Sequence, residues 1–354
     1  MKSLSAKNHV SVAIVGSLLM AVGVGEPAAA DQFNAAPLFP QVDSYNTTVF
    51  TNGDLADIFF PITSNSNVSQ QKFPIALLLP GSQVDTSQYT EFAQIVASYG
   101  FTVVVPEHIR SLPDFGFMGL LPEASQINHV LDFMVAENSN PNSPIADTVD
   151  TDNLVLLGHS FGGSVGLSAI DNSCIFPLCE GQFQRPKQLR AGAFFGSSTL
   201  VGTGQFFPIS NQGIPVALVR GSQDGLVVPE LTQVDYGLIQ EPPKALITVD
   251  GANHFGITNI NNPPGARTDL NNPTLAQAQA IETIARWSAL FLRAYALDDD
   301  GAFDYINNTG DALDENVTVI SQVKTVPEAH SVWSLFLIML MFPVLRLRSQ
   351  SRVS

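Results

Sequence analysis

Charged residues, and basic ones above all, are scarce in this sequence. Asp, Glu, Lys and Arg make up 14% of its 354 residues, against roughly 25% in an average soluble domain. The 16 Lys and Arg are outnumbered by 32 Asp and Glu, which gives a formal net charge of −16. Because nucleic-acid binding needs a basic stripe that neutralises phosphates, we expect no nucleic-acid partner. The apolar fraction of 45% excludes charge-driven disorder and is enough for a large core.

The sequence has no apolar run of about 20 residues, the length that an ordinary transmembrane helix needs. The longer of two short runs, residues 10–24, follows Lys2 and Lys7 and precedes Ala28-Ala29-Ala30. A positive start, a short apolar segment and small residues before the cleavage point are typical of a secretory signal peptide. We predict that residues 1–30 are a signal peptide and that the protein is exported. An uncleaved membrane anchor is the alternative.

The second short run, residues 332–345, lies near the C-terminus and is followed by Arg346, Arg348 and Arg352. As a helix it would span about 21 Å, less than the roughly 30 Å of a hydrocarbon core, so by length alone it could be a buried helix. The arginines favour a cytoplasmic end. Together with Val326-Pro327-Glu328, the tail over residues 326–354 resembles the PEP-CTERM sorting signals of exported bacterial proteins, although Ala329 stands where that family usually has a second proline. The resemblance implies membrane association through residues 332–345, processing by an exosortase, and a periplasmic, cell-surface or extracellular location.

Cysteine is nearly absent, since the chain contains only Cys174 and Cys179. In an oxidising compartment two cysteines this close can form a small disulfide loop, worth about 2 kcal/mol on the chain-entropy account. A redox motif would have two intervening residues, and a zinc site would need further ligands nearby. We therefore predict a disulfide here, and we expect neither a metal nor a cofactor.

The middle of the chain alternates strand-like and helix-like segments. Continuous apolar strands that alternate with helices predict the α/β class, with a mostly parallel central sheet and helices on both faces. We assign residues 31–297 to this domain and residues 298–325, which are polar and acidic, to a linker. The predicted strands are residues 56–63, 73–79, 101–106, 153–157, 191–195, 215–220 and 245–249, and the predicted helices include 89–98, 124–136 and 275–297.

One motif indicates a catalytic serine. Gly158-His159-Ser160-Phe161-Gly162 follows the apolar strand 153–157 and matches the nucleophile elbow, in which a sharp strand-to-helix turn exposes the serine. Gly162-Gly163-Ser164-Val165-Gly166 fits the same pattern, but Ser164 falls one turn into the predicted helix. Ser160 is therefore the candidate nucleophile.

A serine nucleophile needs a base, and the base needs an acid that orients it. His254 follows the strand 245–249 and Asp224 follows the strand 215–220, so both lie at the sheet edge where Ser160 emerges. The order Ser, Asp, His is that of the α/β-hydrolase triad. Asp250, four residues before His254, is the competing acid, and we favour Asp224 because it lies on a separate strand end.

An acyl-transfer site also needs donors for the developing oxyanion. The amide of Phe161, directly after the nucleophile, is one candidate, and Ser82 in the loop after the strand 73–79 is the other, although Pro80-Gly81 there could be an ordinary turn. Two aromatic segments, residues 115–118 and 206–207, would either cover an acyl pocket or pack in the core.

Over roughly residues 48–296 the pattern resembles the α/β-hydrolase superfamily. Gly158-His159-Ser160-Phe161-Gly162-Gly163, Pro80-Gly81 and Tyr99-Gly100-Phe101-Thr102-Val103-Val104-Val105-Pro106 look like the group of platelet-activating-factor acetylhydrolases, chlorophyllases, dienelactone hydrolases and bacterial polyester hydrolases. The resemblance implies a serine hydrolase that acts on carboxylic esters. We expect a neutral or apolar ester as substrate. A binding protein that keeps the fold without the chemistry, and an acyltransferase, are the alternatives.

Overall fold

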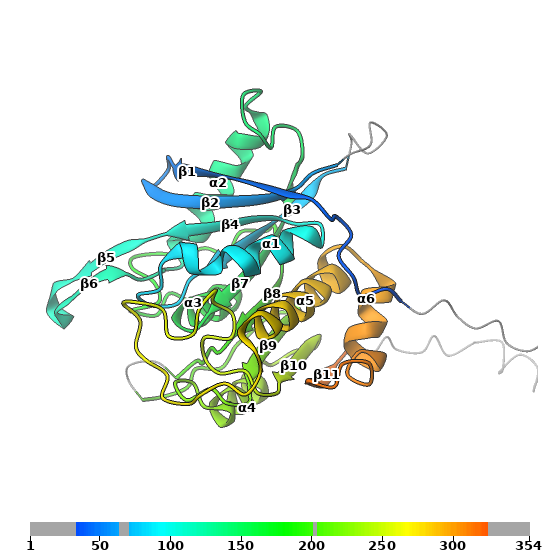
Figure 1. Cartoon of the computed structure of the whole chain (residues 1–354). Coiled ribbons are helices and arrows are strands. Elements are labelled where there is room, and N and C mark those ends of the chain that lie inside the picture. Colours follow the sequence, from blue (N-terminus) through cyan, green and yellow to red (C-terminus); the bar gives the residue numbers. More distant parts are fainter. Residues whose placement is uncertain (1–32, 64–70, 201–203, 325–354) are drawn as a thin grey trace, which may run out of the picture. The chain divides into compact units, whose positions relative to one another are not determined.

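The computed structural model describes residues 33–63, 71–200 and 204–324 of the chain (Figure 1). Both predicted terminal segments, the signal peptide and the sorting tail, lie outside the described residues. The chain divides into two units, residues 1–34 and 35–354, and the fold described below is that of the second. None of the helices in the described ranges is long and apolar enough to cross a membrane.

The core of the fold is a nine-stranded sheet in the order β1-β2-β4-β3-β7-β8-β9-β10-β11. The six strands from β4 to β10 in this order are parallel, and β1, β2 and β11 are antiparallel to their neighbours. This confirms the predicted α/β class with a mostly parallel sheet. The strands are β1 (Val42–Val49), β2 (Asp54–Pro61), β3 (Phe73–Leu79), β4 (Thr102–Glu107), β7 (Val149–His159), β8 (Leu189–Phe195), β9 (Val216–Gly221), β10 (Lys244–Val249) and β11 (Val317–Gln322).

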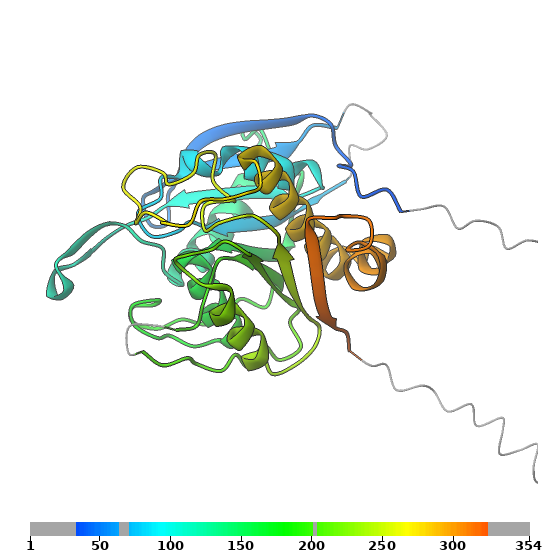
Figure 2. The same cartoon turned by 60° about the horizontal axis from the view of Figure 1, so that its bottom comes forward.

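Helices cover both faces of this sheet (Figure 1, Figure 2). On one face α2, α3 and α4 share a single apolar core with alternate residues of the strands, such as Leu77 and Leu156. On the other face α1 packs against α5. Strand β3 is buried at all seven positions, which explains why its sequence is an unbroken apolar run. The helices are α1 (Thr90–Ser98), α2 (Ser125–Ser139), α3 (Phe161–Asp171), α4 (Pro229–Leu238) and α5 (Gln277–Ala296).

The prediction of a linker over residues 298–325 is wrong. This segment forms α6 (Asp300–Asp304), a π-helical turn (Tyr305–Thr309) and β11, which pairs antiparallel with β10. Its anchoring side chains, Ala302, Tyr305, Ile306 and Val317, are all buried. They are few in a segment that is mostly polar and acidic, so a composition-based prediction overlooks them.

Charge pairing also joins this segment to the domain. Asp314 accepts a hydrogen bond from Arg286 Nη2 at 2.8 Å and one from Trp287 Nε1 at 2.9 Å, and both donors lie on α5. The pKa of Asp314 is lowered because these hydrogen bonds and the Arg286 charge outweigh the effect of its burial. The domain therefore extends to β11, beyond the predicted boundary at residue 297.

Sequence reasoning also missed β1, α4 and a hairpin made of β5 (Ile109–Leu112) and β6 (Phe117–Leu120). The hairpin protrudes from the body of the domain (Figure 1). It remains attached to the loop after β3, because the amide of Gln83 donates to the carbonyl of Leu120 at 2.9 Å.

We expect a chain that stops after residue 297 to be destabilised by at least about 5 kcal/mol, because four buried apolar side chains and the β10–β11 ladder are lost. A chain that stops after residue 324 is the matched control and should keep the stability of the full protein. Urea unfolding followed by circular dichroism measures both. Equal stability of the two truncated chains would contradict the assignment of β11 to the domain.

Candidate active site

The site is organised around an abrupt turn between β7, which ends at His159, and α3, which begins at Phe161. Ser160 in the turn has φ 53° and ψ −121°, a conformation that L-residues adopt at a cost. The turn has room only for glycine on both sides. A Cβ at Gly162 would lie 2.1 Å from the carbonyl oxygen of Leu79, and one at Gly158 would lie 2.7 Å from the Cα of Gly163. Close packing of backbone on backbone thus holds the serine in its strained position.

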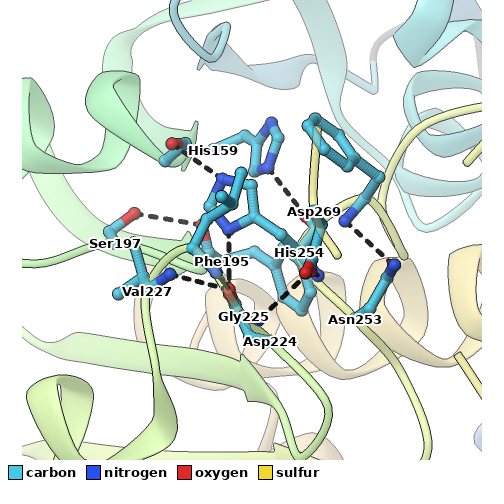
Figure 3. Close-up of polar contacts among 12 residues, drawn as sticks. His159, Phe195, Ser197, Asp224, Gly225, Val227, Asn253, His254 and Asp269 are labelled. Atoms are coloured by element: carbon cyan, nitrogen blue, oxygen red, sulfur yellow. Dashed lines mark hydrogen bonds and ion pairs between the residues drawn. The ribbon is translucent and has the colours of Figure 1, made fainter. Parts of the chain in front are cut away.

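Three of the predicted residues come together at this turn. His254 Nε2 lies 2.9 Å from Ser160 Oγ, and His254 Nδ1 lies 2.9 Å from Asp224 Oδ2. Figure 3 shows the His254 imidazole above the carboxylate of Asp224. The three side chains follow β7, β9 and β10, whose carboxyl ends meet at one edge of the parallel sheet. Asp224 and His254 are almost completely buried.

The structure separates the two candidate acids. Asp224 contacts the imidazole and accepts a hydrogen bond from the amide of Val227 at 2.8 Å (Figure 3). It also accepts one from the amide of Leu226 at 2.9 Å. Asp250 is exposed and accepts a hydrogen bond from Ser222 Oγ at 2.6 Å. Of these two carboxylates, Asp224 is the one that orients His254.

A third carboxylate, Asp269, was not found by sequence reasoning. Its Oδ2 accepts from the amide of His254 at 3.0 Å and from the amide of Gly225 at 3.2 Å (Figure 3). Its Oδ1 accepts from the amide of Asn271 at 2.8 Å. Asp269 is buried and joins the loop that carries the imidazole to the loop that carries Asp224. It stands in a long irregular loop with no motif around it, so the sequence gives no signal of this role.

Gly196, at the end of β8, is a second feature that sequence reasoning missed. It has φ +56°, and a Cβ there would lie 3.0 Å from Asp224 Oδ2 and 3.1 Å from His254 Nδ1. Both the left-handed backbone and the close approach to the two side chains require glycine. The loop after β8 therefore packs directly against the Asp224–His254 pair.

The two predicted oxyanion donors lie at the same cavity as Ser160. Phe161 is the first residue of α3, where a helix leaves amides without intrahelical partners. In the loop after β3, the amide of Gly81 donates to Tyr89 Oη and that of Gln83 donates to Leu120. Between them, the amide of Ser82 has no hydrogen-bond partner within the ranges that the structure describes. Among the described residues, the amides of Phe161 and Ser82 thus lie at the cavity of Ser160 without a hydrogen-bond partner.

The cavity has a volume of about 590 Å³, within the usual range for small-molecule sites. Apolar side chains such as Val84, Leu200, Leu226 and Val227 contribute to its lining, and no carboxylate is among the described residues that form its wall. Neither predicted aromatic segment lines it. Phe115 and Met118 are exposed on the protruding hairpin, and Phe207 packs against the core on the α2–α4 side of the sheet.

His159, which fills the variable position of the motif, is completely buried beside the triad. Its Nε2 lies 2.9 Å from the carbonyl oxygen of His254, and its Nδ1 lies 2.8 Å from Tyr89 Oη. Burial, together with the nearby His254, lowers the pKa of His159 well below its usual value. His159 is therefore a neutral imidazole at physiological pH.

The structure also shows the predicted disulfide and two further histidines. Cys174 and Cys179 form a disulfide with a Cα–Cα distance of 5.0 Å. His108 pairs with Asp54 at 2.9 Å, and His129 lies on α2. Among the residues placed by the structure, no group of three or more His, Cys, Asp or Glu side chains is arranged to hold a metal.

In a comparison with known protein families, residues 27–177 match the PETase family, described as PET hydrolase-like. The match implies a serine ester hydrolase of the α/β-hydrolase superfamily. A search of curated proteins finds no match. The matched segment contains Ser82 and Ser160 but ends before Asp224 and His254, so the geometry of the acid and base is independent of it.

We expect Asp269→Ala to lower the free energy of unfolding by about 2–5 kcal/mol, because it leaves the buried amide of His254 and the part-buried amide of Gly225 without an acceptor. Asp250→Ala, which removes an exposed carboxylate from the adjacent loop, should cost less than about 1 kcal/mol. Urea unfolding of both variants tests this difference. Similar losses in the two would show that Asp269 does not hold the loops together.

Because folding keeps His159 neutral, we expect it to make stability depend on pH. The unfolded chain protonates this residue below about pH 6.5 while the folded protein does not, so its contribution is complete above pH 6.5 and declines as the pH falls, by up to about 1.4 kcal/mol per unit. The slope of unfolding free energy against pH between 5 and 6.5 should be smaller in His159→Gln than in the natural protein. Equal slopes would mean that His159 titrates normally in the folded state.

Proposed function

We propose that the protein is an exported serine hydrolase that cleaves carboxylic esters through an acyl-enzyme intermediate, with Ser160, His254 and Asp224 as its catalytic triad. The observation that carries the proposal is the continuous contact from Ser160 Oγ through the His254 imidazole to the Asp224 carboxylate. The family match over residues 27–177 supports the same reaction class.

In the first half-reaction, Ser160 Oγ attacks the ester carbonyl carbon while His254 Nε2 takes the serine proton. The carbonyl π electrons move to the oxygen, and the amides of Phe161 and Ser82 stabilise this oxyanion, each worth about 3–4 kcal/mol. The tetrahedral intermediate collapses, the C–O bond to the alcohol breaks, and His254 returns the proton to the departing alkoxide. Asp224 keeps the Nδ1–H of His254 oriented and stabilises the imidazolium.

In the second half-reaction, water occupies the place of the alcohol. His254 takes a proton from the water, the resulting hydroxide attacks the acyl carbon, and the carboxylic acid leaves as Ser160 regains its proton. No step requires a metal or a redox cofactor.

The substrate proposed here is a neutral or apolar ester. The apolar side chains of the cavity suit an acyl or alcohol chain without charge. The acidic surface agrees with this, because residues 31–345 contain 11 Lys and Arg against 31 Asp and Glu, a net charge of −20 that repels anions at long range. The name of the matching family adds polyesters to the esters worth testing.

Export and surface attachment are part of the proposal. The arrangement of residues 1–30 supports a signal peptide, and the disulfide between Cys174 and Cys179 agrees with an oxidising compartment. We propose that residues 326–354 associate with the membrane through residues 332–345 until an exosortase removes them. Mass spectrometry of the mature protein, which would give both ends of the processed chain, tests these cleavages.

The decisive experiment is labelling with a fluorophosphonate, which modifies only an activated serine. We expect one label per chain, located on Ser160, and we expect Ser160→Ala to abolish both labelling and ester hydrolysis, with a loss of at least about 10⁴-fold in kcat. Ser164→Ala is the matched control and should still be labelled, because the Ser164 hydroxyl already donates to the carbonyl of Ser198 at 2.6 Å. No labelling of the natural protein would contradict the proposal and favour a binding protein.

A panel of esters with graded acyl length, together with a polyester film, would define the substrate. Analysis of the products with an added alcohol acceptor separates hydrolysis from acyl transfer. Free acid as the main product supports the hydrolase, and a new ester as the main product would make the protein an acyltransferase.

A further inference from the structure

Two buried side chains next to the triad take part in a chain of hydrogen bonds. The reaction steps described above do not use this chain. The amide of Gly81 lies 2.7 Å from Tyr89 Oη, Tyr89 Oη lies 2.8 Å from His159 Nδ1, and His159 Nε2 lies 2.9 Å from the carbonyl oxygen of His254. Tyr89 and His159 are both completely buried. One end of the chain is thus in the loop of the oxyanion donor Ser82, and the other is on the backbone of the base.

The direction of every bond in this chain is fixed. A carbonyl oxygen only accepts, so His159 Nε2 carries the proton and donates to His254. Because His159 is neutral, its Nδ1 has a lone pair and must accept, so the hydroxyl of Tyr89 donates to it. Tyr89 Oη in turn accepts from the amide of Gly81. Burial raises the pKa of Tyr89, which keeps the hydroxyl proton in place.

We propose that Tyr89 and His159 are positioning residues that hold the oxyanion loop, residues 80–83, in register with the backbone of the base His254. This inference rests on the proposed function.

The packing around Gly81 makes the connection stiff. A Cβ at Gly81 would lie 2.9 Å from His159 Nδ1 and 3.3 Å from Tyr89 Oη, so the backbone of the oxyanion loop lies directly on both side chains. On the other side, the backbone of His254 is held at its carbonyl by His159 and at its amide by Asp269. A shift of His159 therefore moves both the base and the loop that carries Ser82.

The neutral state of His159 matters for the chemistry. Its ring centroid is 4.8 Å from that of His254, which becomes an imidazolium when it takes the serine proton. A second positive charge at this distance would oppose that step. The hydrogen bonds to Tyr89 and to the His254 carbonyl satisfy both nitrogens of His159 without adding charge.

The first test is Tyr89→Phe, with a soluble p-nitrophenyl ester as substrate. We expect kcat to fall roughly 10- to 100-fold, the effect of a small misplacement of reacting groups, and KM to change less than about 3-fold. Tyr99→Phe is the matched control. This variant also removes a hydroxyl from a buried tyrosine, but that hydroxyl donates to the carbonyl of Ala35, at 2.8 Å, and not to His159. We expect Tyr99→Phe to keep the natural kcat.

The second test compares two replacements of His159. Glutamine can still donate an N–H to the carbonyl of His254, whereas leucine fills the space without a donor. We expect His159→Gln to keep at least about 10-fold more of the natural kcat than His159→Leu does. Equal kcat values in the two variants would mean that the donor has no effect on the reaction.

A third measurement uses the natural protein and does not depend on the folding of any variant. In ¹⁵N-labelled protein, the His159 ring should show a protonated Nε2 and an unprotonated Nδ1 that does not titrate between pH 5 and 9. A protonated Nδ1, or titration in this range, would overturn the proposed chain of donors even if Tyr89→Phe failed to fold.

The outcomes separate this inference from the proposed function. A natural protein that neither reacts with the fluorophosphonate nor hydrolyses esters overturns the proposed function, and the positioning role with it. An active natural protein whose folded Tyr89→Phe variant has the same kcat overturns only the positioning role.

Discussion

The parallel pairing of β7, β8, β9 and β10 is the constraint on which the rest of the site depends. It brings the ends of β7, β9 and β10 to one edge of the sheet, so that Ser160, Asp224 and His254 approach one another although nearly a hundred residues of chain separate the first from the last. The loop after β8 fills the space between them, and Gly196 there has no side chain that would keep the imidazole from the carboxylate. The sheet determines where the loops begin, and backbone packing determines how closely they meet.

Contacts made to the backbone hold the proposed catalytic residues in place. Gly162 packs on the carbonyl of Leu79, the amide of His254 is held by Asp269, and its carbonyl is held by His159. Each of these polar contacts is buried, so an unpaired donor or acceptor at any of them carries the full cost of desolvation. Of the residues responsible, the sequence marks Gly162 and His159 only as parts of a motif and does not mark Asp269 at all.

The three residues of the proposed triad could be predicted from the sequence, but most of the residues that hold them in place could not. Each of the three, Ser160, Asp224 and His254, follows a strand that is buried on both faces. Such strands can be recognised in a sequence as unbroken apolar runs. Asp224 and Asp250 each follow such a run, and the sequence favours Asp224 only because it lies on a separate strand end. The contact of Asp224 with His254 is visible only in the structure. The prediction of a linker over residues 298–325 was wrong because only a few side chains of this acidic segment, among them Tyr305 and Val317, are buried. Tyr89 could not be connected with His159 because 70 residues separate them in the chain and only the fold brings them together.

Strand β11 supports His254 indirectly, through its pairing with β10. Without it, β10 would be the border of the sheet, and border strands fray first when a protein warms. Since β11 pairs with β10 along six residues, the strand that leads to His254 is hydrogen-bonded on both sides. We therefore expect local opening at this end of the sheet to begin in β11, while β10 stays paired with β9 and the loop that carries His254 keeps its anchor.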